Sequence, residues 1–418
     1  MKLPVLNINE VAERQLCTGC GVCASLEPER FRMDDAPSYG RRPVLAGEAP
    51  EETGDALRAC PGASLTHTFD ESDPDLLEEL RPAWGPVYEV WEGHASDHDI
   101  RLAGSSGGAA TALALFAIER QGMAGVLHTG ASGVRRHLNE TVYSTTRADL
   151  LSRTGSRYAP ASPADRLDLV LAQDQPSVFI GKPCDVAGVQ QARRFRDDLD
   201  AKLGLTIAFF CAGVPSTRGN LALLEKIGVS DPAALRSLRY RGNGWPGLWT
   251  AEWTDAEGES HTAQMTYAES WGFLQQYRQW RCYICPDHSG EFADIAVGDP
   301  WYRPVEPGEP GKSLIIARTR RGVEILRAAA EAGYITLETR DPSLLPRSQA
   351  NLLSTRGRLF GQTLVMRVMG AAVPKFSGFP TFPHWLRHLS LSMKLRSLTS
   401  TVTRVRRRNL RKRIDPFA

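Results

Sequence analysis

The sequence has no long hydrophobic run, and this absence sets the first limits on what the protein can be. Nothing in its 418 residues approaches the roughly 18 consecutive apolar residues of a membrane-spanning helix. The first ten residues lack the apolar core of a secretory signal. A net charge of only +2 provides no overall basic field, so we expect no nucleic-acid partner. These absences favour a cytoplasmic protein, and the length allows two or three domains.

Cysteine is also scarce, since eight residues in a chain of this length are too few for a secreted disulfide scaffold. They are clustered instead. Cys17, Cys20 and Cys23 form C-x2-C-x2-C, and the distant Cys60 is followed by proline. Ferredoxins hold a [4Fe–4S] cube with such a set, and we expect one here. The second ferredoxin repeat is eroded after Cys23, and zinc bound by the same thiols is the alternative.

The other four cysteines suggest a second cube. Cys184 and Cys211 each follow an apolar segment that we expect to be a buried strand, and Cys282 and Cys285 form another C-x2-C. In open α/β sheets ligands bind at the carboxyl ends of the strands, which is where the first two cysteines would lie. The alternatives for this set are redox-active thiols or a simple dithiol.

Two small-residue loops flank these segments. Residues 105–108 read Ser-Ser-Gly-Gly and precede a helix that we expect over 109–120, because this stretch is rich in Ala and Leu. Backbone N–H groups at the start of a helix can hold a phosphate, although both serines are equally suited to cap the helix. Residues 154–160 form a second compact polar loop, for which a surface turn is the alternative.

The C-terminal region differs in composition from the rest. Spaced leucines and Trp385 precede seven Arg and Lys residues between Arg404 and Arg413. A basic amphipathic tail of this kind can bind an anionic membrane surface, so we consider a peripheral contact with the inner membrane face. The alternative is a packed helix with a solvated charged end.

Seven short motifs occur in the order Cys-x2-Cys-x2-Cys, Ser-Ser-Gly-Gly, Gly-Ser-Arg-Tyr, Gly-Lys-Pro-Cys, Cys-Ala-Gly-Val-Pro-Ser, Cys-x2-Cys-Pro-Asp and Ala-Asp-Ile-Ala-Val-Gly-Asp. With them, over about residues 15–320, the chain resembles the coenzyme F420 hydrogenase/dehydrogenase beta-subunit family. That family also includes 7-hydroxymethyl chlorophyll a reductase and a divinyl chlorophyllide reductase. The eroded second ferredoxin repeat departs from members that have both repeats.

The resemblance implies FAD in an α/β domain. It assigns cofactor binding to the two small-residue loops, and it suggests three residues at the site wall, among which we look for a proton donor. The predicted cofactor-binding residues are Ser105, Ser106, Gly107, Gly108, Gly155, Ser156 and Tyr158. The predicted catalytic residues are Lys182, Tyr158 and Asp299.

We therefore predict an α/β protein, α+β overall, in three parts. Residues 1–80 would form a ferredoxin-like [4Fe–4S] module, residues 81–345 an FAD-binding α/β catalytic domain that contains the second cysteine set, and residues 346–418 a helical, basic extension.

The function we expect is that of an iron–sulfur flavoprotein oxidoreductase. It would pass electrons between [4Fe–4S] clusters and FAD, because clusters carry single electrons and a flavin carries two. Its partners would be a ferredoxin or deazaflavin donor and a small organic substrate, and homo-oligomerisation is left open. One alternative is a non-catalytic electron-transfer subunit of a larger complex. Another is a zinc-stabilised interaction protein without redox activity.

Overall fold

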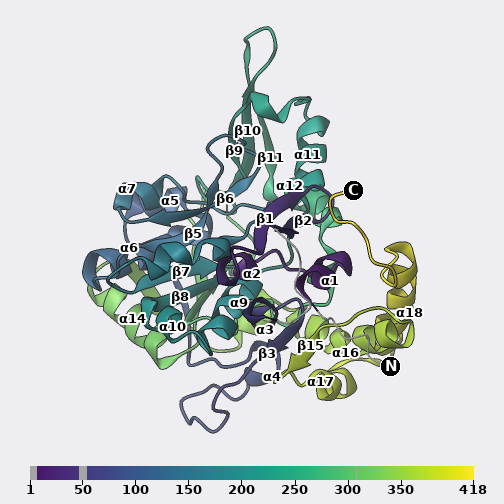
Figure 1. The fold of residues 1–418 in the computed structure, drawn as a ribbon. Coiled ribbons are helices and arrows are strands. Elements are labelled where there is room, and N and C mark those ends of the chain that lie inside the picture. Colours follow the sequence, from purple (N-terminus) through teal and green to yellow (C-terminus); the bar gives the residue numbers. More distant parts are fainter. Residues whose placement is uncertain (1–6, 47–53, 307) are drawn as a thin grey trace.

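The computed structural model describes residues 7–46, 54–306 and 308–418 (Figure 1). Residues 1–6, where we expected no secretory signal, and residues 47–53 of the predicted ferredoxin-like module lie outside the described ranges. Within those ranges, every helix is too short or too polar to cross a bilayer.

An eight-stranded mixed sheet is the centre of the fold, and helices pack on both of its faces. Its order is β14–β4–β13–β12–β8–β7–β5–β6. The four strands β12, β8, β7 and β5 run parallel to one another, and the strands on both sides of them are antiparallel to their neighbours. The strand bounds are β4 (Glu89–Ala95), β5 (Val126–Ala131), β6 (Asn139–Ser144), β7 (Ser177–Gly181), β8 (Leu203–Phe209), β12 (Ile295–Gly298), β13 (Ser313–Ala317) and β14 (Ile335–Thr339).

Alternation of apolar side chains divides the core between the two faces of this sheet. In β7, Val178 and Ile180 belong to one buried cluster, and Phe179 belongs to the other. The first face is covered by α6 (Ala109–Arg120) and α14 (Arg320–Glu331). The second is covered by α9 (Pro183–Arg193) and α10 (Asp197–Lys202). Because both faces are covered, the central strands are apolar throughout, as expected for parallel strands.

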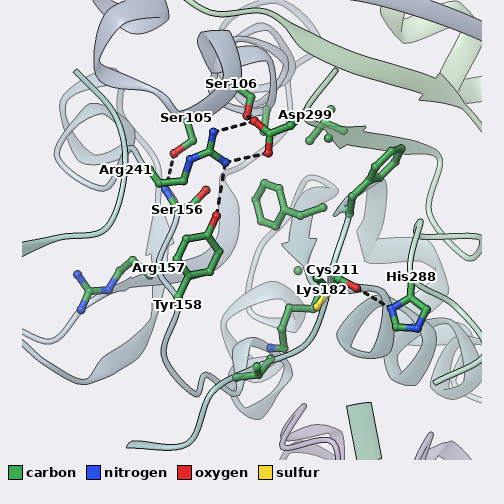
Figure 2. Close-up of a pocket in the computed structure, with 18 of the residues that line it drawn as sticks. Ser105, Ser106, Ser156, Arg157, Tyr158, Lys182, Cys211, Arg241, His288 and Asp299 are labelled. Atoms are coloured by element: carbon green, nitrogen blue, oxygen red, sulfur yellow. Dashed lines mark hydrogen bonds and ion pairs between the residues drawn. The ribbon is translucent and has the colours of Figure 1, made fainter. Parts of the chain in front are cut away.

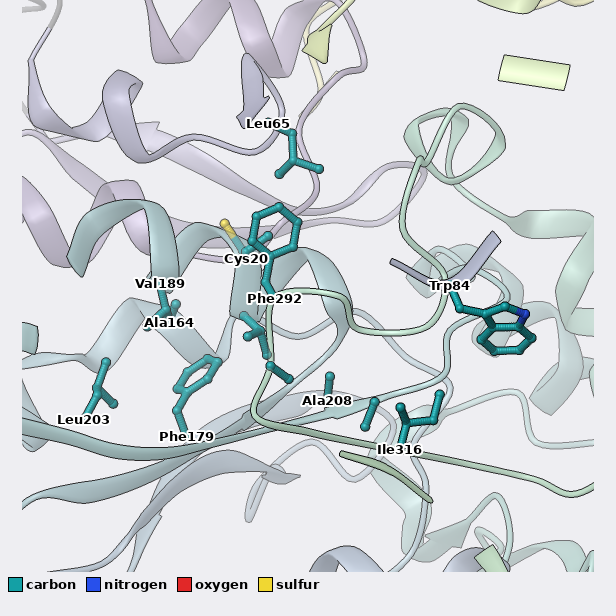
Figure 3. Packing of buried hydrophobic residues seen from close by; sticks show 14 of the residues in the cluster. Cys20, Leu65, Trp84, Ala164, Phe179, Val189, Leu203, Ala208, Phe292 and Ile316 are labelled. Carbon is teal, nitrogen blue, oxygen red and sulfur yellow. The ribbon is translucent and has the colours of Figure 1, made fainter. Parts of the chain in front are cut away.

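The N-terminal module lies against the second face. It contains α1 (Ile8–Glu13), α2 (Val22–Leu26), β1 (Phe31–Ala36), β2 (Gly40–Leu45), α3 (Asp55–Ala59) and β3 (Ser64–Thr66). Its Cys20 and Leu65 share a buried cluster with Phe179 of the sheet and Val189 of α9 (Figure 3). The module is therefore joined to the sheet by a common hydrophobic core.

A three-stranded antiparallel sheet stands apart at one end of the molecule (Figure 1). Its strands are β9 (Leu235–Arg239), β10 (Leu248–Thr254) and β11 (Ser260–Thr266), and it packs with α11 (Thr217–Lys226) and α12 (Tyr267–Leu274). Shorter elements of the chain are α4 (Arg81–Trp84), α5 (His98–Ala103), η1 (Ser105–Gly108), α7 (Arg147–Leu151), η2 (Pro163–Arg166), α8 (Asp168–Leu171), η3 (Pro232–Ala234), η4 (Gln275–Tyr277), α13 (Trp280–Tyr283) and α15 (Leu344–Ser348).

The C-terminal residues form α16 (Leu352–Val368), β15 (Lys375–Ser377), α17 (Thr381–His388) and α18 (Leu391–Arg407). They return to the start of the chain. β15 pairs in parallel with β3 of the N-terminal module. Val405 and Leu410 are buried in the same cluster as Ile8 and Val11. The expected fold class is confirmed, and the three-domain division stays a prediction.

Candidate redox and cofactor site

The first cysteine set is completely enclosed. Cys17 and Cys20 lie in the turn before α2, Cys23 lies in the first turn of α2, and Cys60 caps the end of α3; all four are buried. The turn contains two glycines with positive φ, Gly19 at 76° and Gly21 at 91°, a conformation that side chains rarely adopt. A Cβ at Gly21 would lie 2.7 Å from the backbone N of Asp165.

The four thiols of this set are electrostatic neighbours. Burial, and then the nearby Cys17, raise the pKa of Cys60 to about 12. Burial also raises the pKa of Cys20 and Cys23, with contributions from the other thiols of the set. A cationic metal cluster would favour the thiolate form of these three buried thiols, because metal ligands bind deprotonated.

The second set assembles at the carboxyl edge of the sheet. Cys184 lies in the first turn of α9, Cys211 follows β8, and Cys282 and Cys285 lie in and just after α13. The Val214 N–H donates to Cys282 Sγ over 3.4 Å. Burial, and then the neighbouring Cys282, raise the pKa of Cys211 to about 12.

In the described ranges, no group of three or more His, Cys, Asp or Glu side chains is close enough to bind one metal ion.

Helix α9 connects the two sets. Cys184 belongs to the second set, and Gly188, one turn further along, faces the first: a Cβ at Gly188 would lie 3.4 Å from Cys20 Sγ. Arg42 is a second connection, with only 1% of its surface exposed. It donates twice to Oε1 of Gln279, over 3.1 Å each, and the Gln279 carbonyl accepts the Cys282 N–H.

A cavity of about 540 Å³ opens beside the second set (Figure 2). It lies at the carboxyl ends of the parallel strands, where Lys182 follows β7, Cys211 follows β8 and Asp299 follows β12. Such a volume is within the range of small-molecule and cofactor sites. The predicted loop residues that line it are Ser105, Ser106, Gly108, Gly155, Ser156 and Tyr158.

The first small-residue loop has an unusual backbone. Ser106, Gly107 and Gly108 have φ of 51°, 77° and 71°, and α6 begins after Gly108 without a side-chain cap. Neither serine therefore caps the helix. The Ser105 Oγ instead accepts the Ser156 N–H over 2.8 Å, which ties the two predicted loops together.

Gly107 has a different place from the one we expected. It does not line the cavity, and a Cβ there would lie 3.0 Å from the backbone of Gly311 and Lys312. Glycine is required here for the packing of two loops, and the cavity wall is formed by the residues on either side.

Asp299 is the centre of a polar cluster. Its carboxylate accepts from the Ser106 hydroxyl, from Trp245 Nε1 over 2.8 Å, and from both Nη atoms of Arg241 over 2.7 and 2.8 Å. Burial alone would raise the pKa of Asp299, but Arg241 and these donors outweigh it and lower the pKa. Asp299 is thus a fixed anion that orients Arg241, and it is poorly suited to donate a proton.

Lys182 and Tyr158 lie on the wall between the cysteines and this cluster. Lys182 Nζ donates to Asp185 over 2.6 Å and to the Ala161 carbonyl over 3.3 Å. Burial would lower the pKa of Lys182, but Asp185 and the adjacent Cys184 raise it. Burial raises the pKa of Tyr158, whose hydroxyl lies 3.4 Å from Arg241 Nη1. Both groups hold their protons at neutral pH.

The sequence reasoning missed one wall of the cavity. Arg241, Tyr267, Trp271 and Trp301 line it, and the Tyr267 and Trp301 rings stack with centroids 5.5 Å apart. Arg241 begins a glycine-rich stretch, Arg-Gly-Asn-Gly-Trp-Pro-Gly, and a buried charge beside such a loop is the signal that would have found it.

Comparison with known proteins gives consistent matches. Residues 90–167 and 175–343, more than half of the chain, match the N-terminal and the C-terminal model, respectively, of the family described as "Coenzyme F420 hydrogenase/dehydrogenase, beta subunit". Residues 11–66 match a "4Fe-4S single cluster domain". The N-terminal module is therefore a 4Fe–4S domain, which replaces the zinc alternative for the first set and agrees with the eroded second repeat.

Individual relatives point the same way. The coenzyme F420 hydrogenase subunit beta of Methanothermobacter thermautotrophicus is 24% identical over 259 residues, which are 60% of this chain and 83% of that protein. A ferredoxin of Thermococcus litoralis is 38% identical over 55 residues, 13% of this chain and 88% of the ferredoxin. A chain of the F420-reducing [NiFe] hydrogenase complex from Methanosarcina barkeri has the same fold, with a TM-score of 0.54 and 20% identity over 72% of this chain and 98% of that chain.

Proposed function

We propose, because this chain belongs to the coenzyme F420 hydrogenase/dehydrogenase beta-subunit family, that it is an iron–sulfur flavoprotein oxidoreductase. It would pass electrons between two [4Fe–4S] clusters and FAD, and either reduce an organic acceptor or exchange hydride with an F420-type deazaflavin. Bound clusters would supply single-electron transfer, and bound FAD would supply the conversion to two-electron, hydride-type chemistry.

One observation carries this proposal: Cys211 belongs to the second cysteine set and also lines the cavity. Lys182, which neighbours both Cys184 and Cys211, lies on the same wall. A cluster held by the second set would therefore adjoin whatever fills the cavity. The first set lies on the far side of α9, which supports an order of first set, second set and cavity.

The cavity wall suits a large aromatic, anionic cofactor. Ser105, Ser106, Gly108, Gly155, Ser156 and Tyr158 stay our proposed cofactor-binding residues. Arg241 adds a cation that Asp299 holds in place, and such a preorganised group stabilises negative charge at little reorganisation cost. Tyr267 and Trp301, which stack on each other, add aromatic side chains to this wall. Gly107 would act indirectly, by shaping the loop.

Lys182 and Tyr158 are the proposed proton donors, since both keep a proton at neutral pH and both face the cavity. Asp299 is proposed to orient Arg241. The donor of electrons would be a ferredoxin or a deazaflavin, the substrate a small organic molecule, and the location the cytoplasm; homo-oligomerisation is left open.

The second candidate function is a non-catalytic electron-transfer subunit. It is favoured by the names of the relatives, which include a hydrogenase subunit and a chain of a hydrogenase complex. In that case electrons would leave through a docked partner and the cavity would hold no substrate.

Turnover by the isolated chain separates the two functions. The chain is purified anaerobically, reduced chemically and mixed with an oxidised F420-type deazaflavin or a set of organic acceptors. We expect the acceptor's absorbance to change in repeated turnovers, and a Cys211→Ser variant to lose this activity. A reducible chain that never turns over without a partner would favour the electron-transfer subunit.

A further inference from the structure

We propose that the C-terminal helices form a docking surface for an anionic lipid bilayer. The surface, called the apolar patch below, consists of Leu364, Val368, Phe382, Leu386, Leu391 and Leu395. The proposal does not depend on which cofactors the protein binds.

The charge of the chain is strongly divided. Residues 346–418 contain 15 Lys and Arg residues and a single acidic residue, Asp415. The remaining residues contain 35 Lys and Arg against 47 Asp and Glu. The near-neutral total therefore hides a basic C-terminal region, which anionic headgroups would attract in preference to the rest of the molecule.

Each of the three C-terminal helices exposes an apolar pair one turn apart. On α16, Leu364 is 40% and Val368 79% exposed. On α17, Phe382 and Leu386 are 49% and 51% exposed. Leu391 and Leu395 on α18 are 73% and 54% exposed. Residues four apart share a helix face, so each pair is a local stripe.

Contacts between the helices join these stripes. Phe360, one turn before Leu364, has its ring centroid 4.9 Å from that of Phe382. At the other end of α17, Lys394 Nζ donates to the Leu386 carbonyl over 2.8 Å, which brings the start of α18 beside Leu386. The three helices lie together on one side of the molecule (Figure 1). The three exposed pairs therefore lie on helices that contact one another.

Unpaired cations surround the apolar patch. Arg367, Arg387 and Arg396 are exposed and form no ion pair within the described part of the chain. Lys394 lies over the Trp385 ring, 5.5 Å from its centroid. Exposed leucines and phenylalanines flanked by such cations are typical of surfaces that enter the headgroup region of an anionic membrane.

Three of the seven cations in the basic run between Arg404 and Arg413 contact the protein itself. Arg404 and Arg408 both lie over the Tyr283 ring, and Arg413 pairs with Glu10 and Glu13. These cations hold the helix to the protein. The proposed membrane contact therefore includes the start of α18 and its neighbours as well as the exposed part of the basic run.

Vesicle co-sedimentation of the full chain tests the proposal. We expect binding to vesicles of phosphatidylcholine with phosphatidylglycerol at low salt, weakened by added salt and much weaker with phosphatidylcholine alone. A Leu391→Gln/Leu395→Gln double variant should bind at least about tenfold more weakly, since two leucines no longer enter the bilayer. Arg387→Gln and Arg396→Gln should each weaken binding about fivefold.

The matched control is Val134→Gln, because Val134 is 89% exposed on the turn between β5 and β6. It should bind like the wild type, and all variants should keep the wild-type circular dichroism and iron content. Failure of the wild type to bind the anionic vesicles, or equal binding by the leucine double variant, would overturn the proposal. The proposal would also be overturned if the chain bound an acidic protein but no vesicles, and if the leucine double variant bound that protein as well as the wild type does.

Discussion

Asp299 and Arg241 form a buried ion pair in which each partner depends on the other. Replacing Asp299 with Asn would leave the Arg241 guanidinium, 2% exposed, without its counter-charge. We expect the free energy of unfolding to fall by about 3–5 kcal/mol, the usual cost of breaking such a pair. Asp168→Asn is the control, because its pair with Arg166 is exposed and should be worth under about 1 kcal/mol. Denaturant titration measures both.

The pH dependence of this effect has a definite sign. The pKa of Asp299 is lower in the folded protein than the ordinary value of about 3.9, so its stabilisation is fully present above that pH. It fades as the pH falls through the folded pKa, because protonation removes the charge. The wild type and Asp299→Asn should therefore converge in stability in strong acid. A constant difference down to about pH 2 would contradict the ion-pair interpretation.

Arg42 is a buried cation beside both cysteine sets. Cys17 and Cys282 are the two largest charge neighbours of its guanidinium. Because a cluster gains an electron on reduction, a nearby positive charge favours the reduced form. Arg42→Met should lower a cluster reduction potential by about 60 mV, which corresponds to a tenfold change in the reduction equilibrium constant of a one-electron couple. A redox titration followed by electron paramagnetic resonance measures it.

The control for this shift is Arg32→Met, since Arg32 lies on the same hairpin with 65% of its side chain exposed. Its potentials should match the wild type. Unchanged potentials in Arg42→Met, with iron content retained, would show that the guanidinium only packs between the sets.

At the scale of elements, α9 is the partition between the two cysteine sets. Gly188→Leu would push a side chain from this helix toward Cys20, whose Sγ lies 3.4 Å from the position of the first added carbon. We expect the first set to lose its cluster, so that iron falls from about eight to about four per chain. Gly272→Leu in α12 is the control, because that position faces open space. Full iron content in Gly188→Leu would place the first cluster elsewhere.

The sequence predicted those helices and strands whose position depends on residues close together in the chain. The helix expected over 109–120 is α6 with the same bounds. Its sequence is rich in Ala and Leu, and it begins directly after Gly108, whose left-handed backbone is not helical. The buried strand expected before Cys184 is β7, which is apolar because both of its faces are covered. Other features depend on contacts that are distant in sequence. Arg241 reaches Asp299 from the loop after β9, although the two residues are far apart in the sequence.

At the scale of the whole molecule, the last residues complete the first module. Val405 and Leu410 are 1% and 2% exposed and share a core with Ile8. A chain that ends at Ser400 should lose at least about 2 kcal/mol of unfolding free energy, since buried apolar side chains are removed. No local pattern revealed this contact, because its partners are about 400 residues apart in the sequence.

The matched control for this truncation ends at Pro416 and removes only Phe417 and Ala418, both exposed. Its denaturation midpoint should equal that of the full chain. If the chain ending at Ser400 had the same free energy of unfolding as the full chain, the residues after Ser400 would not contribute to the stability of the N-terminal module.

The central claim is that two cysteine sets and one cavity form a single electron path within this chain. Anaerobic titration with dithionite, followed by visible absorbance, tests it most directly. Two cubes take up one electron each and FAD takes up two, so we predict about four electrons per chain. Uptake of about three electrons per chain would mean that the second cluster is absent. Uptake of about two electrons would mean that either the flavin or both clusters are absent, and it would contradict the proposed electron path.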